Sequence, residues 1–150
     1  MYKRILLTLD GSELAEQALP HAITQAEHFR AELILLRVLK PLGEILYRPV
    51  SLVRSAEDTT RELAREYLEQ VATGVREIGI SARVVTVDGY PHEEIVRFAE
   101  NEQVDLIVTC TRGQSGLSRW LMGRVADRVV RGVTVSLLLI HAQKDRDGVK

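Results

Sequence analysis

The chain has 150 residues, of which 45% are hydrophobic and 27% are charged, and its formal net charge is −1. These values are typical of one soluble globular domain, and they exclude intrinsic disorder and a chain of two ordinary domains. The charge also argues against a protein that holds nucleic acid by bulk electrostatics, because neutralising phosphates requires a clustered excess of Lys and Arg.

Neither the apolar runs nor the N-terminus indicates export or membrane insertion. The longest runs, such as 33–36 and 133–140, are far shorter than the roughly 20 residues of a spanning helix. The start of the chain has no signal-peptide core, and the single cysteine, Cys110, forms no internal disulfide. We therefore expect a cytoplasmic protein with no membrane attachment.

The first elements in the chain are a strand and a helix. Residues 4–9 form a nearly continuous apolar run that ends at Asp10-Gly11, as expected of a strand buried on both faces. Ser12 is a good helix cap, and an apolar stripe with helical spacing follows as far as Phe29. Pro20 lies inside this helix and lacks an amide proton, so it predicts a bend rather than a break.

A second strand and a second helix follow. Residues 32–39 are apolar enough for another buried strand, and Lys40 opens an irregular stretch that we expect to reach about Arg54. Ser55 and Asp58 then resemble a capping box, which predicts a helix start there and an end near Gly79. The apolar stripe of this helix consists of Leu63, Ala64, Tyr67, Leu68, Val71, Val75 and Ile78.

The second half of the chain repeats the alternation. Residues 81–87 are rich in β-branched side chains, Asp88-Gly89 breaks the run, and Pro91 starts a helix. Residues 104–109 form a fourth strand, 117–131 a helix, 133–141 a fifth strand, and the polar tail 143–150 is expected to fray. Alternating strands and helices predict an α/β fold with a parallel sheet, helices on both faces and right-handed crossovers.

Ligands of such sheets bind beyond the carboxyl ends of the strands. Here strand one ends in Asp10, strand two in Val38, and strand four in 109–116. Gly113 and Gly116 let backbone amides approach an anion, and the side chains of Thr111, Arg112 and Ser115 add donors. The alternatives are a simple glycine turn for this loop, a turn or cap role for Asp10, and a core role for Val38.

Several segments resemble the universal stress protein family. They are Leu-Thr-Leu-Asp-Gly-Ser at 7–12, the segment 89–95, Val-Asp-Leu-Ile-Val at 104–108, and the run from Gly113 to Asp127. The likeness covers nearly all of residues 2–141, so it implies one domain over 1–142. It also implies a five-stranded Rossmann-like sheet of the adenine nucleotide alpha hydrolase type, with strand order 3-2-1-4-5.

Nucleotide-binding members of that family carry glycine, two residues, glycine, nine residues, glycine, then serine or threonine. Gly113 and Gly123 match the middle and last glycines, whereas Cys110 and Arg124 occupy the positions of the first glycine and the hydroxyl residue. Cys110 adds a side chain where backbone approaches phosphate, and Arg124 replaces a small donor with a long cation that can bind phosphate or fill its place.

The resemblance implies an ATP site, with or without Mg²⁺, and no catalytic residue or protein metal ligand. Asp10 and Val38 would lie beside the adenosine, Thr8 behind it, and 110–116 with 123–126 around the phosphates. The candidate site residues are Thr8, Asp10, Val38, Cys110, Thr111, Arg112, Gly113, Gln114, Ser115, Gly116, Gly123, Arg124, Val125 and Ala126.

Three functions remain open from the sequence. The first is a nucleotide-binding stress or regulatory module that is not a fast enzyme and acts on a protein partner. The second is a family member without nucleotide that works as a dimeric interaction protein. For both, the resemblance implies a homodimer through the last strand, 133–140. The third is a phosphoacceptor receiver domain, with Asp88 near a strand end, although the acidic pair expected after strand one is missing.

Overall fold

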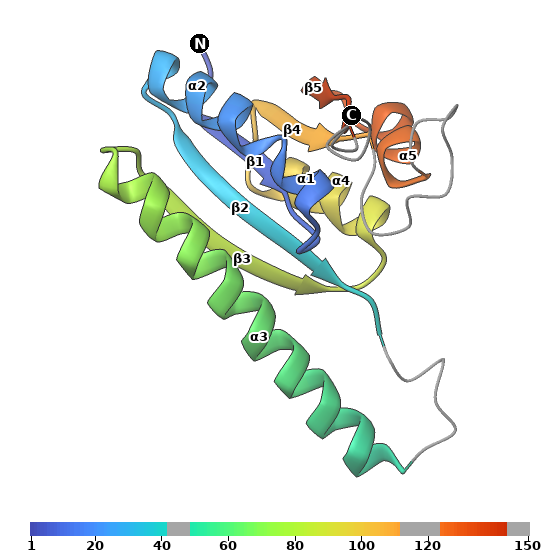
Figure 1. The fold of residues 1–150 in the computed structure, drawn as a ribbon. Coiled ribbons are helices and arrows are strands. Elements are labelled where there is room, and N and C mark those ends of the chain that lie inside the picture. Colours follow the sequence, from blue (N-terminus) through green and yellow to red (C-terminus); the bar gives the residue numbers. More distant parts are fainter. Residues whose placement is uncertain (42–48, 112–123, 144–150) are drawn as a thin grey trace, which may run out of the picture.

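A computed structural model describes residues 1–41, 49–111 and 124–143. Its centre is a five-stranded parallel sheet in the order β3-β2-β1-β4-β5 (Figure 1). The strands are β1 (Arg4–Thr8), β2 (Glu32–Leu39), β3 (Ala82–Asp88), β4 (Leu106–Cys110) and β5 (Ser136–Ile140). This confirms the predicted fold class and strand order.

Helices cover both faces of the sheet, as predicted (Figure 1). The helices are α1 (Glu13–Glu16), α2 (Leu19–Phe29), α3 (Val50–Glu77), α4 (Pro91–Asn101) and α5 (Arg124–Gly132). Successive residues of a strand point to opposite faces. Ile5 and Leu7 of β1 pack with side chains of α1, α2 and α3, whereas Leu6 packs with side chains of α4 and α5. We call these the α1–α3 face and the α4–α5 face.

The predicted bend at Pro20 is wrong, because the helix is divided in two. Ser12 caps α1 as predicted, since its hydroxyl accepts the amide of Ala15 at 3.1 Å. The chain then makes i to i−3 bonds, from the amide of Gln17 to the carbonyl of Leu14 and from that of Ala18 to the carbonyl of Ala15. Pro20 has no amide to bond back into α1, so it fits only near the start of the new helix α2.

The predicted start of the next helix is also wrong. The helix α3 begins at Val50 after Pro49, and Ser55 and Asp58 lie inside it. Asp58 does not cap the helix but pairs with Arg61 at 3.2 Å, one turn on. The prediction failed because a Ser with an Asp three residues later also fits the interior of a helix, where the acidic residue pairs along the surface.

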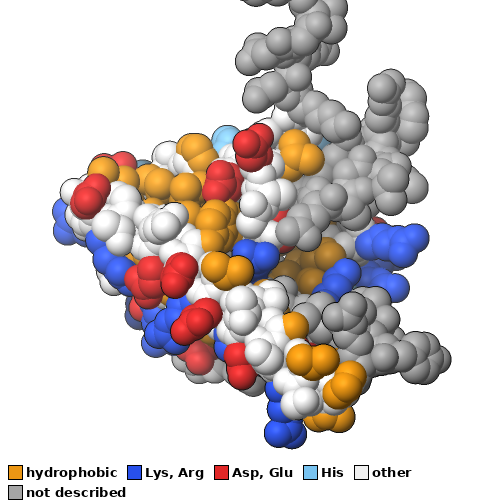
Figure 2. Space-filling view, turned by 60° about the horizontal axis from the view of Figure 1, so that its bottom comes forward, with side chains coloured by type: hydrophobic (Ala, Val, Ile, Leu, Met, Phe, Trp, Pro, Cys, Tyr) orange, Lys and Arg blue, Asp and Glu red, His pale blue; other side chains and the backbone are white. Residues whose placement is uncertain are grey.

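The helix α3 is half outside the body of the protein. Its buried residues are Ala64, Leu68, Ala72 and Val75, all in the C-terminal part. Leu63 and Ile78, which we placed on the apolar stripe, are exposed. The N-terminal part extends beyond the sheet (Figure 1), and hydrophobic side chains are visible at its free end (Figure 2), where Val50 and Leu52 are exposed.

The C-terminal segment agrees with the prediction in part. The strand β5 is shorter than the predicted 133–141 and pairs with β4. Gln143, the first residue of the predicted frayed tail, exchanges two hydrogen bonds with Gln17, at 2.7 and 2.9 Å. Residues 144–150 lie outside the described residues, as does 117–123 of the predicted helix 117–131. Among the described helices, none is long and apolar enough to cross a membrane.

Candidate functional site

Two threonines meet where β1 and β4 end. The strands run parallel with Leu6 beside Ile107 and Leu7 beside Val108, so Thr8 comes to lie beside Thr109. Their hydroxyl oxygens are 2.6 Å apart, and either can be the donor. Because Leu6 and Ile107 face α4 and α5, the alternation of strand side chains puts both hydroxyls on the same face. The carboxyl edge thus has a polar pair in an otherwise apolar layer.

The α4–α5 face also carries the other described apolar candidates. Val38 near the end of β2 and Val125 in the first turn of α5 are partly buried and pack against the core of this face. Ala126 is buried beside Val125 in α5. Thr8, Val38 and the helix α5 that carries Val125 and Ala126 therefore lie on the same side of the sheet.

Asp10 builds the turn between β1 and α1. Its Oδ1 accepts the amide of Ser12 at 2.9 Å and the hydroxyl of Ser12 at 2.5 Å, while that hydroxyl in turn accepts from Ala15. Gly11 lies between them with φ of +84°, a conformation that side chains disfavour. The turn role that we left open for Asp10 is thus confirmed, and it fixes the carboxylate at the end of β1.

Cys110 faces the opposite side of the sheet. Its thiol donates to the carbonyl of Leu14 at 3.0 Å and lies 3.6 Å from that of Ala15, both in α1. Burial raises the pKa of the Cys110 thiol to about 11, and the negative charge of Asp10 adds to this. Cys110 thus packs against α1, and its side chain does not reach the face on which Thr8 and Val38 lie.

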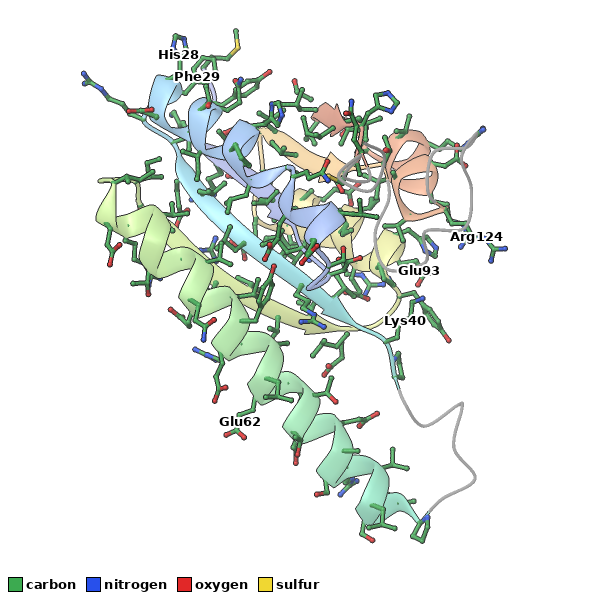
Figure 3. All side chains as sticks on the ribbon, in the orientation of Figure 1. His28, Phe29, Lys40, Glu62, Glu93 and Arg124 are labelled. Carbon is green, nitrogen blue, oxygen red and sulfur yellow. The ribbon has the colours of Figure 1, made fainter. Side chains whose placement is uncertain are left out.

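The remaining candidates are placed only in part. Thr111 is buried, and its amide donates to the carbonyl of Ile140. Arg124 is exposed at the start of α5. Figure 3 shows Arg124, Lys40 and Glu93 on the side of the molecule where the strands end. Arg112, Gly113, Gln114, Ser115, Gly116 and Gly123 lie outside the described residues.

Two residues near this edge were not predicted as part of the site. Thr109 is one. It directly precedes the candidate Cys110 at the end of β4, the strand that pairs with β1, so its position in the sequence was a usable signal. The other is Arg37, whose guanidinium lies against Gly11. The sequence signal for Arg37 was its charge, because it is the one charged residue inside the apolar run 33–39 of β2.

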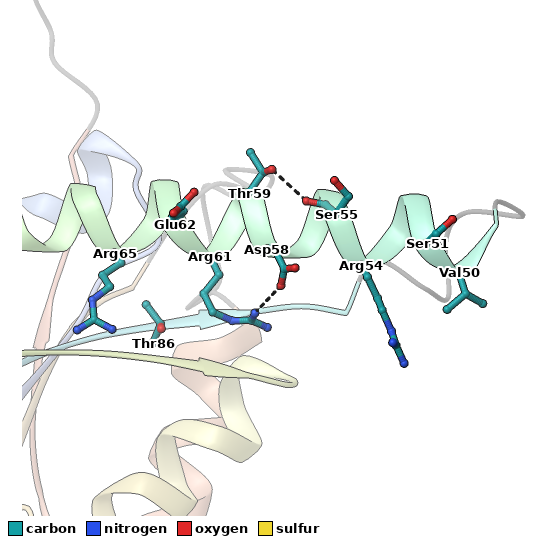
Figure 4. Close-up of a pocket in the computed structure, with 10 residues that line it drawn as sticks. All are labelled: Val50, Ser51, Arg54, Ser55, Asp58, Thr59, Arg61, Glu62, Arg65 and Thr86. Carbon is teal, nitrogen blue, oxygen red and sulfur yellow. Dashed lines mark hydrogen bonds and ion pairs between the residues drawn. The ribbon is translucent and has the colours of Figure 1, made fainter.

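A separate groove of about 800 Å³ lies between the projecting part of α3 and β3 (Figure 4). Arg61, which lines the groove, pairs with Asp88 at 2.6 Å and with Asp58 at 3.2 Å. Arg54 and Arg65 point to the same side of the helix as Arg61 (Figure 4). Thr86 contributes from the strand. None of the described candidate residues lines this groove, so it is distinct from the carboxyl-edge site.

The carboxyl edge carries groups that can contact a ligand. The described part offers hydroxyls at Thr8 and Thr109, a carboxylate at Asp10 and an apolar surface at Val38. No group of three His, Cys, Asp or Glu side chains among the described residues is arranged to hold a metal ion. The arrangement suits a ligand with an apolar face and several hydrogen-bonding groups.

Known proteins match this chain along nearly all of its length. The model of the universal stress protein family matches residues 1–141. Universal stress protein MJ0531 of Methanocaldococcus jannaschii is 32% identical over 144 residues, which cover 96% of this chain and 85% of the relative. These matches confirm the resemblance carried by the sequence motifs.

Solved structures agree with this assignment. The structure of MJ0577 superposes with a TM-score of 0.86 at 29% identity and covers 97% of this chain and 99% of its own. A universal stress protein in complex with cAMP superposes with a TM-score of 0.69 at 23% identity, covering 95% and 99%, and at this identity it shows the shared fold. The chain belongs to the universal stress protein family.

Proposed function

We propose that this protein is an adenine-nucleotide-binding regulatory module, with ATP as the ligand, at the carboxyl edge of β1, β2 and β4. The observation that carries the proposal is the convergence of Thr8, Asp10 and Val38 at this edge. Ligands of open parallel sheets bind at this edge, where the strand order reverses between β1 and β4. The cAMP complex of a family member supports the same ligand class.

Each described group has a role in this proposal. Val38 offers an apolar surface to the purine, and the Asp10 carboxylate accepts from ribose hydroxyls while its other oxygen holds the turn. The family resemblance assigns the phosphates to 110–116 and 123–126. Arg124 at the start of α5 then supplies a cation in place of the family's hydroxyl residue.

The position of Cys110 removes one objection to nucleotide binding. Cys110 stands where the family motif has its first glycine, and a side chain that pointed toward the ligand there would block the approach of backbone to phosphate. The thiol instead donates to Leu14 of α1, on the α1–α3 face. The substitution is therefore compatible with a ligand on the α4–α5 face, and Arg124 remains the departure that only binding measurements test.

We further propose that the bound nucleotide regulates a homodimer and its protein partner without rapid turnover. In support, the hydroxyls of Thr8 and Thr109 bond to each other, and among the described residues neither bonds to a histidine or carboxylate that could serve as a general base. The outer strand β5 offers the partly buried side chains of 137–140 for pairing with a second copy. Analytical ultracentrifugation with and without ATP tests this dimer.

The nucleotide is tested by purifying the protein natively, denaturing it and identifying any released nucleotide by chromatography, followed by calorimetric titration with ATP and Mg²⁺. Asp10→Asn should weaken binding, because the amide offers one acceptor fewer. Asp105→Asn is the matched control, since Asp105 also accepts two backbone amides, from Lys3 and Arg4, but at the amino edge of the sheet.

Released or micromolar-binding ATP that Asp10→Asn weakens and Asp105→Asn leaves unchanged supports the proposal. If no nucleotide is released and the titration gives no heat, while the dimer is intact, the proposal fails. The protein is then the interaction module of the same family.

A further inference from the structure

The Asp10-Gly11-Ser12 turn is covered by a side chain from the neighbouring strand. A Cβ atom built on Gly11 would lie 3.0 Å from Nη1, 3.3 Å from Cζ and 3.4 Å from Nη2 of Arg37. These distances are tighter than ordinary van der Waals contact, so a side chain at position 11 would require the guanidinium to move by a few tenths of an ångström. The positive φ of Gly11 favours glycine at this position, and the guanidinium of Arg37 packs into the space that a side chain would occupy.

Arg37 is itself held by an aromatic ring. Its Cζ lies 5.9 Å from the centre of the Tyr67 ring, within the range of a cation–π interaction. The Tyr67 hydroxyl donates to the carboxylate of Glu16 in α1. Burial, then the hydrogen bond and charge of Glu16, raises the pKa of Tyr67, so the phenol stays a donor at all ordinary pH values. The ring is thus fixed at both its face and its hydroxyl.

In the described part of the chain, the Arg37 guanidinium stacks on the Tyr67 ring but has no hydrogen-bond or ion-pair partner. Several other arginines pair with carboxylates, as Arg61 does with Asp88 and Arg83 with Glu32 and Glu102. Arg37 is partly buried and forms no ion pair or hydrogen bond among the described residues. A half-buried cation without a carboxylate loses solvation, which points to a role in the packing of this turn.

We propose that Arg37, stacked on Tyr67, is a positioning residue that holds the Asp10-Gly11 turn in its nucleotide-binding conformation. Arg37 acts through Asp10: it limits the freedom of Gly11, the most flexible residue of the turn, and so keeps the Asp10 carboxylate directed by its bonds to Ser12. Because Tyr67 belongs to α3, the same contact couples the nucleotide turn to the long helix. The effect on nucleotide affinity rests on the proposed function.

The first test needs no nucleotide. The amides of Ser12 and Ala15 are bonded to the side chains of the turn, so their hydrogen exchange reports its order. Arg37→Ala and Arg37→Lys should each speed this exchange by about tenfold, because the lysine keeps the charge but lacks the flat guanidinium. The control is Arg83→Ala, which removes an arginine of the neighbouring strand at the amino edge.

The second test is a double-mutant cycle on the affinity for ATP. Arg37→Ala and Tyr67→Ala should each weaken ATP about tenfold, and together no more than either alone, because they break one contact. Tyr67→Phe keeps the ring and should bind within about twofold of the wild type. Thermal unfolding of each variant verifies that it is folded.

The outcomes separate the two proposals. Faster exchange at Ser12 and Ala15 in the Arg37 variants, with weaker ATP binding, supports the positioning role. If the exchange is unchanged, or ATP binds the Arg37 variants as tightly as Arg83→Ala, the positioning role is overturned while nucleotide binding stands. If the wild type binds no ATP, the proposed function fails, and the exchange data alone decide whether Arg37 orders the turn.

Discussion

At the scale of single residues, the carboxyl edge is organised by the alternation of side chains along each strand. Thr109 and Cys110 are consecutive in β4, yet one hydroxyl bonds to Thr8 on the α4–α5 face and the thiol bonds to Leu14 on the other. Neighbouring positions thus have different surroundings: Thr109 lies at the carboxyl edge beside Thr8, and Cys110 packs against α1.

The thiol of Cys110 should be unreactive in the folded protein. Its pKa is about 11 against an ordinary value of 9.0, so at pH 8 the thiolate fraction is lower by about 100-fold. We expect iodoacetamide to alkylate the native protein far more slowly than the protein in urea. Alkylation of the native protein within tenfold of the rate in urea would contradict the buried position.

The same pKa value predicts the sign of a pH effect. Because the folded-state pKa is raised, the unfolded thiol ionises first as the pH increases. The stability contributed by this group is complete below about pH 9 and is lost as the pH rises toward 11. Urea denaturation of Cys110→Ala should accordingly show a smaller loss of stability than the wild type over this interval. An equal loss in both proteins would show that the thiol has no part in it.

The Thr8–Thr109 bond should contribute measurably to stability. Thr109→Val keeps the shape but leaves the half-buried Thr8 hydroxyl without this partner, which costs about 1 kcal/mol. The pair Thr8→Val with Thr109→Val removes both hydroxyls, so its cost should be below the sum of the single variants. Urea denaturation of the three variants measures this, and strictly additive costs would mean that the bond contributes nothing.

At the scale of elements, the strands and most helices could be predicted because their hydrophobic patterns are strong. The two errors in the helices concern where helices begin. The apolar period continues past Pro20 and predicted one bent helix, but the chain forms two helices there. The Ser55–Asp58 pattern predicted a helix start, but both residues lie inside α3, which begins at Val50. A periodic pattern reports which face is buried, but the ends of a helix depend on which backbone groups find partners.

The two parts of α3 should differ in local stability. The helix is about 42 Å long, and its buried residues are confined to the part from Ala64 onward. The projecting part, 50–63, has no buried residue, and an isolated helix as short as this is only marginally stable in water. Hydrogen exchange should therefore be faster in 52–62 than in 66–76, and mass spectrometry of peptides from the two parts measures this. Equal protection in both would show that something stabilises the projecting part.

At the scale of the whole molecule, the position of the site follows from the topology. Strand order cannot be obtained from periodicity alone, and here it came from the resemblance to a family. Once β1 lies between β2 and β4, the ends that carry Thr8, Val38 and Thr109 meet at one edge. The contact of Arg37 with Gly11 could not be predicted, because it depends on the rotamer of a side chain in a neighbouring strand.

The central claim is that an adenine nucleotide binds at this edge and not in the groove beside α3. The most direct test is a titration of the isotope-labelled protein with ATP and Mg²⁺, followed by NMR of the backbone amides. We predict saturable shifts at 8–12, at Val38 and at 124–126, with the amides of 50–65 and Thr86 unchanged. Shifts confined to the groove residues, or no shifts at millimolar ATP, would contradict the account.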